Sequence, residues 1–156
     1  MKELNEYRQH LMEKLVSVTK EFRDVCLAIP DPFAPLGGDG WSTHQVATHT
    51  RDVHTLVYRF RVERTAQEQN PEFQNFDGDA YMAENYDVDE SLRGILDGLL
   101  ASVQSLVMIL SRLPAEGWSR ESRHATFGGG FTLQTWIERD LAHIEEHLKT
   151  VKMLEQ

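Results

Sequence analysis

The sequence has a single cysteine, Cys26, in 156 residues. An internal disulfide is therefore impossible, and we expect the chain to reside in a reducing compartment, the cytoplasm. Positive charge is also scarce, since 16 Lys and Arg stand against 25 Asp and Glu and give a formal net charge of -9. Such a field repels nucleic-acid phosphates and anionic lipid headgroups, so we expect neither nucleic acid nor a membrane as a partner.

Long apolar runs and prolines are few as well. We see no apolar stretch of the roughly 20 residues that a membrane-spanning helix needs. Residues 1–15 are charged and amphipathic, unlike a signal peptide. The five prolines all lie between the segments that show helical periodicity. We therefore expect a soluble chain with long, uninterrupted helices.

Four segments have apolar residues at spacings of three and four: 4–29, 42–70, 88–113 and 132–154. This spacing places the apolar side chains on one side of each helix, as in a helix bundle. Ser42 followed by Gln45 is a capping-box pattern, so the second helix is predicted to begin there. The predicted inner face of that helix is Val46, His49, Val53, Leu56 and Phe60.

The connections between these segments differ in length. Residues 71–87 lack a long apolar stripe but keep aromatics, and we expect a short helix near 79–85 that covers one end or side of the bundle. Residues 114–130 contain three consecutive glycines and predict a tight turn or a small two-stranded piece. The prediction is an all-α fold, a four-helix bundle with a long, partly helical connection between helices 2 and 3, forming one domain over residues 1–156.

Helical geometry sorts the histidines of the second segment. An α-helix turns about 100° per residue, so positions five apart point in directions about 140° apart. His49 falls on the apolar stripe. We expect His44 and His54 to flank it, in solvent or against a neighbouring helix. His10, on the first helix, is predicted to lie on the surface.

The fourth segment carries a polar cluster. His143 and His147 are four residues apart, and Asp140 precedes them on the same side of the helix. Burying three polar groups in an apolar stripe is costly unless something satisfies them. A metal ion does so, because neutral imidazole is a common metal ligand.

One interpretation joins His49 to His143 and His147 in a single metal site. Three nitrogen ligands with an open position are the catalytic pattern, in which bound water has a lowered pKa. Asp140 would then orient a ligand from the second coordination shell. The alternative is that each histidine is an ordinary boundary residue, and pattern alone leaves both interpretations open.

Two other metal motifs fit less well. His143-x-x-Glu146-His147 has the spacing of the inverted zinc-peptidase motif, with Glu146 as general base. Glu146 lies about 60° and 100° around the helix from the two histidines, and we find no distant carboxylate ligand. Di-iron chemistry needs two Glu-x-x-His motifs, whereas the chain has only Asp140-x-x-His143.

The chain resembles the DinB-like (DinB/YfiT-like) superfamily of four-helix metalloproteins, in order and spacing over almost its whole length. The resemblance lies in four places: Trp41-Ser42 followed by His49, Phe76-Asp77-Gly78-Asp79-Ala80-Tyr81, Arg123-His124 followed by Phe131-Thr132-Leu133, and His143-Ile144-Glu145-Glu146-His147-Leu148. One departure is that Lys149 and Thr150 stand where many relatives have Gln after the last ligand.

This resemblance implies a bundle in which His49, His143 and His147 hold nickel, zinc or a similar ion, with iron or manganese as further options. Characterised members of the superfamily include transferases and isomerases that use mycothiol or bacillithiol. The implied function is thus a metal-dependent thiol transferase acting on a low-molecular-weight thiol and an electrophilic small molecule. The alternatives are a hydrolase using a metal-bound water and a metal-binding stress or accessory protein without turnover.

Other residues have two interpretations each. Arg59, Arg61 and Arg123 either bind an anionic or thiol cosubstrate or are surface residues. Four aromatics either line the mouth of a pocket or pack in the bundle, the second being favoured: Trp41, Trp118, Trp136 and Phe127. Cys26 is predicted to be a packed apolar residue. We also expect a homodimer, since long amphipathic helices often leave an apolar strip for a partner.

Overall fold

The computed structural model describes residues 1–37 and 40–153. Its first helix, α1 (Lys2–Ala28), ends just before Pro30, as predicted. The second rod is continuous but has three parts: α2 (Thr43–Val53), a π-helical segment η1 (His54–Arg59) and α3 (Phe60–Gln67). The last two long helices are α5 (Leu92–Ser111) and α6 (Leu133–Met153). The predicted stripe residue Leu154 lies outside the described residues.

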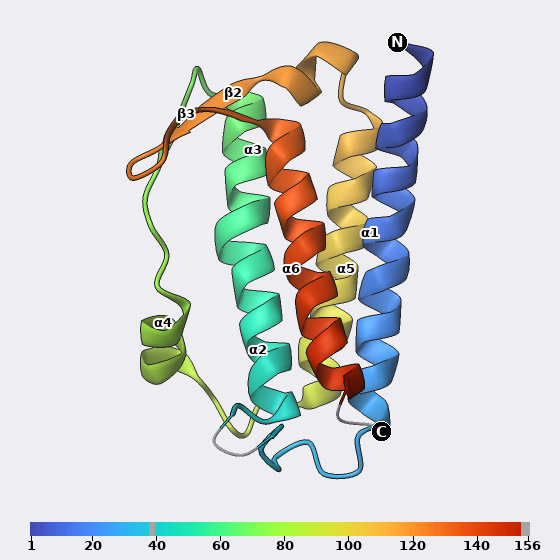
Figure 1. Cartoon of the computed structure of the whole chain (residues 1–156), viewed down its shortest axis with the longest axis vertical. Coiled ribbons are helices and arrows are strands. Elements are labelled where there is room, and N and C mark those ends of the chain that lie inside the picture. Colours follow the sequence, from blue (N-terminus) through green and yellow to red (C-terminus); the bar gives the residue numbers. More distant parts are fainter. Residues whose placement is uncertain (38–39, 154–156) are drawn as a thin grey trace.

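The four rods form the predicted bundle (Figure 1). α1 packs against α5 and α6, and the α2–α3 rod packs against the same two helices from the other side. The first two rods in sequence are therefore diagonal to each other. Fully buried side chains from all four rods meet in one core: Leu15 and Phe22 from α1, Ala47 from α2, Leu99 and Leu106 from α5, and Ile137 and Ile144 from α6.

The capping box at the start of α2 is confirmed. The Ser42 hydroxyl accepts a hydrogen bond from the Gln45 backbone N–H, and the Gln45 side chain accepts one from the Ser42 N–H. The third long helix begins at Leu92, later than the predicted residue 88. Ser91 is its N-cap, because its hydroxyl accepts from the Gly94 N–H.

The predicted inner face of the second rod is wrong beyond Val53. Leu56 and Phe60 are 41% and 47% exposed, whereas Val57 and Arg61 are buried. The cause is η1, because a π-helix turns less per residue than an α-helix. Positions four apart, rather than alternating three and four, then stay on the inner side.

The connections carry small elements around the bundle. α4 (Gly78–Asn85), where a short helix was predicted, lies beside α2 (Figure 1). η2 (Ala115–Ser119) is a short 3-10 helix after α5. β2 (Glu121–His124) and β3 (Gly128–Thr132) form the predicted two-stranded piece, and β1 (Glu72–Phe73) adds an unpredicted parallel strand.

α5 corrects the expectation that no stretch of the chain is long and apolar enough for a membrane-spanning helix. By length and composition it could cross a membrane, with a mean hydropathy of 1.7. The core helix of a soluble protein has the same character, and α5 buries six residues in the bundle. Its exposed side carries Arg93, Asp97 and Gly98 near the start of the helix and two apolar residues, Met108 and Ile109, near its end.

Candidate metal centre

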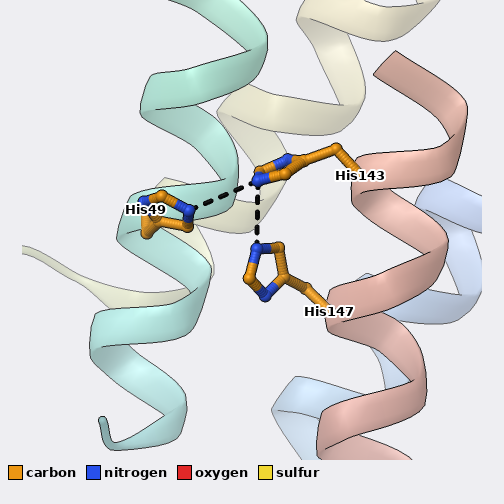
Figure 2. Close-up of side chains that lie close together, drawn as sticks. All are labelled: His49, His143 and His147. Carbon is orange, nitrogen blue, oxygen red and sulfur yellow. Dashed lines mark hydrogen bonds between the residues drawn. The ribbon is translucent and has the colours of Figure 1, made fainter. Parts of the chain in front are cut away.

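Three histidines converge between α2 and α6 (Figure 2). Nε2 of His143 lies 3.3 Å from Nε2 of His49 and 3.0 Å from Nε2 of His147. The three rings are half-buried, and one nitrogen of each lies within 4.8 Å of the other two. The structure thus brings together all three residues that the sequence proposed as ligands.

The spacing and protonation of these nitrogens fit a metal ion. Tetrahedral zinc with nitrogen ligands near 2.0 Å separates those nitrogens by about 3.3 Å. Burial lowers the pKa of His143 to about 3 and that of His147 to about 4, and it also lowers the pKa of His49. Neighbouring imidazoles add to the shift for His143 and His147. Neutral rings keep a lone pair free for a cation.

Local structure holds each ring in place. His143 and His147 project from one side of α6, one turn apart. The capping box fixes the start of α2, so that His49 lies near the middle of that helix, where the Trp41 ring packs 4.9 Å from it. On another side, a Cβ added to Gly78 would lie 2.9 Å from Cε1 of His49. The start of α4 therefore lies directly against a candidate ligand.

Asp140 bonds to a different histidine. His54 Nδ1 donates to Oδ2 of Asp140 over 2.8 Å, and both side chains are fully buried. The Ser102 hydroxyl lies 2.9 Å from His54 Nε2 and accepts a hydrogen bond from Arg59. Donors and acceptors alternate along this chain, which links three rods of the bundle. Three buried side-chain atoms have no hydrogen-bond partner in the described part of the chain, and two of them, Asp140 Oδ1 and His143 Nδ1, belong to this region. A role for Asp140 beside a metal ligand stays a prediction.

The remaining histidines lie outside the trio. His44 and His54 both pack against neighbouring segments, the second of the two predicted placements, and neither is exposed. His44 Nε2 donates to the Glu90 carbonyl, and the Tyr86 hydroxyl donates to its Nδ1. His10 is exposed, as predicted. Glu146, the base of the peptidase motif, is exposed and does not join the cluster.

A cavity of about 320 Å³ adjoins two of the three histidines, His49 and His143. Arg61, Arg139 and His124 line it as well. Of the predicted mouth aromatics, Phe127 lines the cavity and is 70% exposed, whereas Trp118 and Trp136 are buried in the core. The structure thus gives a concave space beside the trio, the usual setting of a small-molecule site.

The three arginines that the sequence proposed as cosubstrate ligands lie in different environments. Arg61 is buried, contrary to a surface role, and its guanidinium lies over the Trp136 ring. Arg59 is half-buried on Ser102 and Glu63, and Arg123 pairs with Glu72 at the surface. Arg139 was not predicted, and only its position four residues before His143 in the sequence could have indicated it.

The comparisons with known proteins address the fold. No protein-family model matches the chain, and no curated protein matches it in sequence. Among solved structures, YfiT from Bacillus subtilis is similar with a TM-score of 0.86 and 21% identity, over 96% of this chain and 86% of its own. The chain has a DinB/YfiT-like fold. YfiT is described as "a probable metal-dependent hydrolase with an unusual four-helix bundle topology". The expected YfiT-like four-helix bundle is thus confirmed.

Proposed function

We propose that His49, His143 and His147 bind a divalent metal ion and that the chain is a metal-dependent enzyme acting on a small molecule. The observation that carries this proposal is the convergence of three Nε2 atoms of neutral histidines, two of which, His49 and His143, line a cavity. A closed structural site has four protein ligands, whereas three leave a position for a reactant. Nitrogen ligands favour nickel or zinc over iron or manganese.

The reaction we favour is thiol transfer. A divalent metal held by His49, His143 and His147 would supply Lewis acidity and would lower the pKa of a bound thiol or water. Neighbouring side chains hold the histidines in place. Phe76, Phe127 and the side chains of α2 and η1 that line the cavity border the space for an electrophile. In the transfer, sulfur forms a bond to the electrophilic carbon, the leaving group departs with its electron pair, and the thiol proton passes to solvent.

Hydrolysis is the second candidate, because the structurally similar YfiT is described as a metal-dependent hydrolase. In that reaction water replaces the thiol as nucleophile, and the same histidines and cavity serve. A metal-binding protein without turnover is the third, and the open cavity beside the trio weighs against it.

The test measures metal content and turnover together. We expect about one metal ion per chain in the wild type and almost none in His147→Ala, because two imidazoles rarely retain an ion through purification. Thiol consumption by a panel of alkyl and aryl halides should follow metal content, disappear on chelation and return on reloading. Aryl esters without thiol test the hydrolase.

His10→Ala is the matched control, since His10 is exposed and distant in sequence from the trio. It should retain both metal and turnover. Equal metal in the wild type and His147→Ala would refute the site, and full turnover after verified metal loss would refute metal-dependent catalysis.

Gly78→Ala is expected to weaken zinc binding by about tenfold, the scale of changes to groups that orient metal ligands. The added Cβ would lie too close to the His49 ring, which must then move. A competition titration against a chromophoric chelator measures the change.

Gly98→Ala is the control, because no atom lies within 4 Å of its added Cβ on α5. That variant should keep its zinc affinity and gain about 0.5–1 kcal/mol in free energy of unfolding. Equal zinc affinities of the two variants would show that α4 does not position His49.

A further inference from the structure

The cavity is lined by two guanidinium groups that have no carboxylate partner among the described residues. Arg61, from α3, and Arg139, from α6, both line it. No ion pair involves either side chain within residues 1–37 and 40–153, although the chain has 25 acidic residues. Among the described residues, no Asp or Glu lines the cavity. A locally positive cavity in a chain of net charge -9 needs an explanation.

Packing against aromatic rings explains the positions of these two side chains, but it does not supply a counter-ion for their positive charge. Arg61 is 8% exposed, lies 4.7 Å from the Trp136 ring centroid and donates one hydrogen bond to the Gln74 carbonyl. Arg139 lies over the Phe131 and Trp136 rings. Arg139 is exposed, whereas Arg61 is a buried cation, and burying a cation without a counter-ion is costly. Burial is the largest cause that lowers the pKa of Arg61; Tyr58 raises this pKa, and the charge of Arg139 lowers it, so the two cations also repel each other.

The neighbouring arginine of the same helix differs in having a carboxylate partner. Arg64, one turn after Arg61, also packs over Phe73, but it forms two hydrogen bonds with the Glu68 carboxylate. Arg61 and Arg139 also lie over aromatic rings but have no such carboxylate partner among the described residues. Two guanidinium groups that share a cavity can together bind one oxyanion.

We propose that this cavity binds the carboxylate of a small organic acid on Arg61 and Arg139. The apolar part of the acid lies against Phe76 and Phe127, which border the same space. The volume of about 320 Å³ is at the lower end of ligand sites and restricts the acid to a small molecule.

The position of Arg139 also orients this acid. Arg139 and His143 are four residues apart on α6, a rise of about 6 Å. An acid whose carboxylate is held at Arg139 therefore places an atom, a few bonds away from that carboxylate, beside the histidines. The proposed substrate class is a small carboxylic acid with an electrophilic carbon a few bonds from the carboxylate. This orientation rests on the proposed function, whereas the anion site itself does not.

The test uses metal-free protein, so that an ion on the histidines cannot bind the probe. Benzoate and its neutral analogue benzamide are titrated by calorimetry into the wild type, Arg139→Gln and Arg64→Gln. We expect benzoate to bind at least about tenfold more tightly than benzamide, because charge-assisted hydrogen bonds are worth more than about 1.4 kcal/mol. Arg139→Gln should remove that preference, and Arg64→Gln should keep it.

Arg61→Gln, checked for folding by circular dichroism, should behave like Arg139→Gln. If it does not fold, the exposed Arg139 decides the question alone. Equal affinity of the wild type and Arg139→Gln for benzoate, equal affinity for benzoate and benzamide, or no benzoate binding would each overturn the anion site. Because the protein is metal-free, these outcomes are independent of the metal content measured for His147→Ala.

Discussion

Replacing Asp140 with alanine is expected to lower the free energy of unfolding by about 3–5 kcal/mol. The substitution leaves the His54 Nδ1–H without an acceptor in a fully buried position. It also breaks the hydrogen-bonded chain from Arg59 through Ser102 and His54, which joins α6 to α5 and the second rod. Denaturant unfolding of metal-free protein measures the loss.

Two further variants test whether the loss of stability comes from the buried His54–Asp140 pair or would follow the removal of any carboxylate. Asp24→Ala, on the exposed side of α1, should cost less than about 1 kcal/mol because surface ion pairs contribute little. The double variant His54→Phe/Asp140→Leu should recover part of the loss, since apolar groups of similar size often replace a buried polar pair. A loss below about 1 kcal/mol for Asp140→Ala would show that the pair is not a stabilising element.

Saturating zinc is expected to raise the melting temperature by roughly 10 °C. A ligand that binds only the folded chain adds about 4 kcal/mol at a free concentration of a thousand times its Kd. For a domain of this size, 1 kcal/mol corresponds to about 2–4 °C. Thermal denaturation with zinc and with excess chelator measures the shift, which chelation should reverse.

His143→Ala should abolish this shift, because Nε2 of His143 lies within 3.3 Å of both other ligand nitrogens. His10→Ala should retain it, since its ring is exposed on α1. A shift of the same size in His143→Ala would mean that zinc stabilises the protein at another place.

Much of the bundle could be predicted from local sequence. Spacings of three and four, the prolines and the Ser42–Gln45 capping box depend on neighbouring residues, and the helices they predicted are present. The inner face beyond Val53 could not be predicted in this way. The π-helical turn of η1 depends on tertiary contacts such as those of His54 with Asp140 and Ser102, which no local pattern reveals. The pairing of β1 with β2 is equally non-local.

The histidine trio could be predicted because its geometry is mostly local. Two histidines four apart on one helix and one on the apolar stripe of another come together whenever the helices pack side by side. The cavity required the fold. Arg61 lies on the inner side of its helix because the π-helical segment changes the angular positions of the residues that follow it. Arg139 could be singled out only from the structure, in which no carboxylate of the described residues pairs with it.

Gly78 and α4 also bear on how reactants enter and leave. The wall of the cavity formed by Phe76 and Gly78 belongs to a segment whose helix buries a single residue, Met82. The opposite wall belongs to the second rod and α6, which share the main core. Local opening requires far less free energy where few apolar contacts are broken. We therefore expect α4 to open this wall of the cavity without loss of the cooperative stability of the four rods.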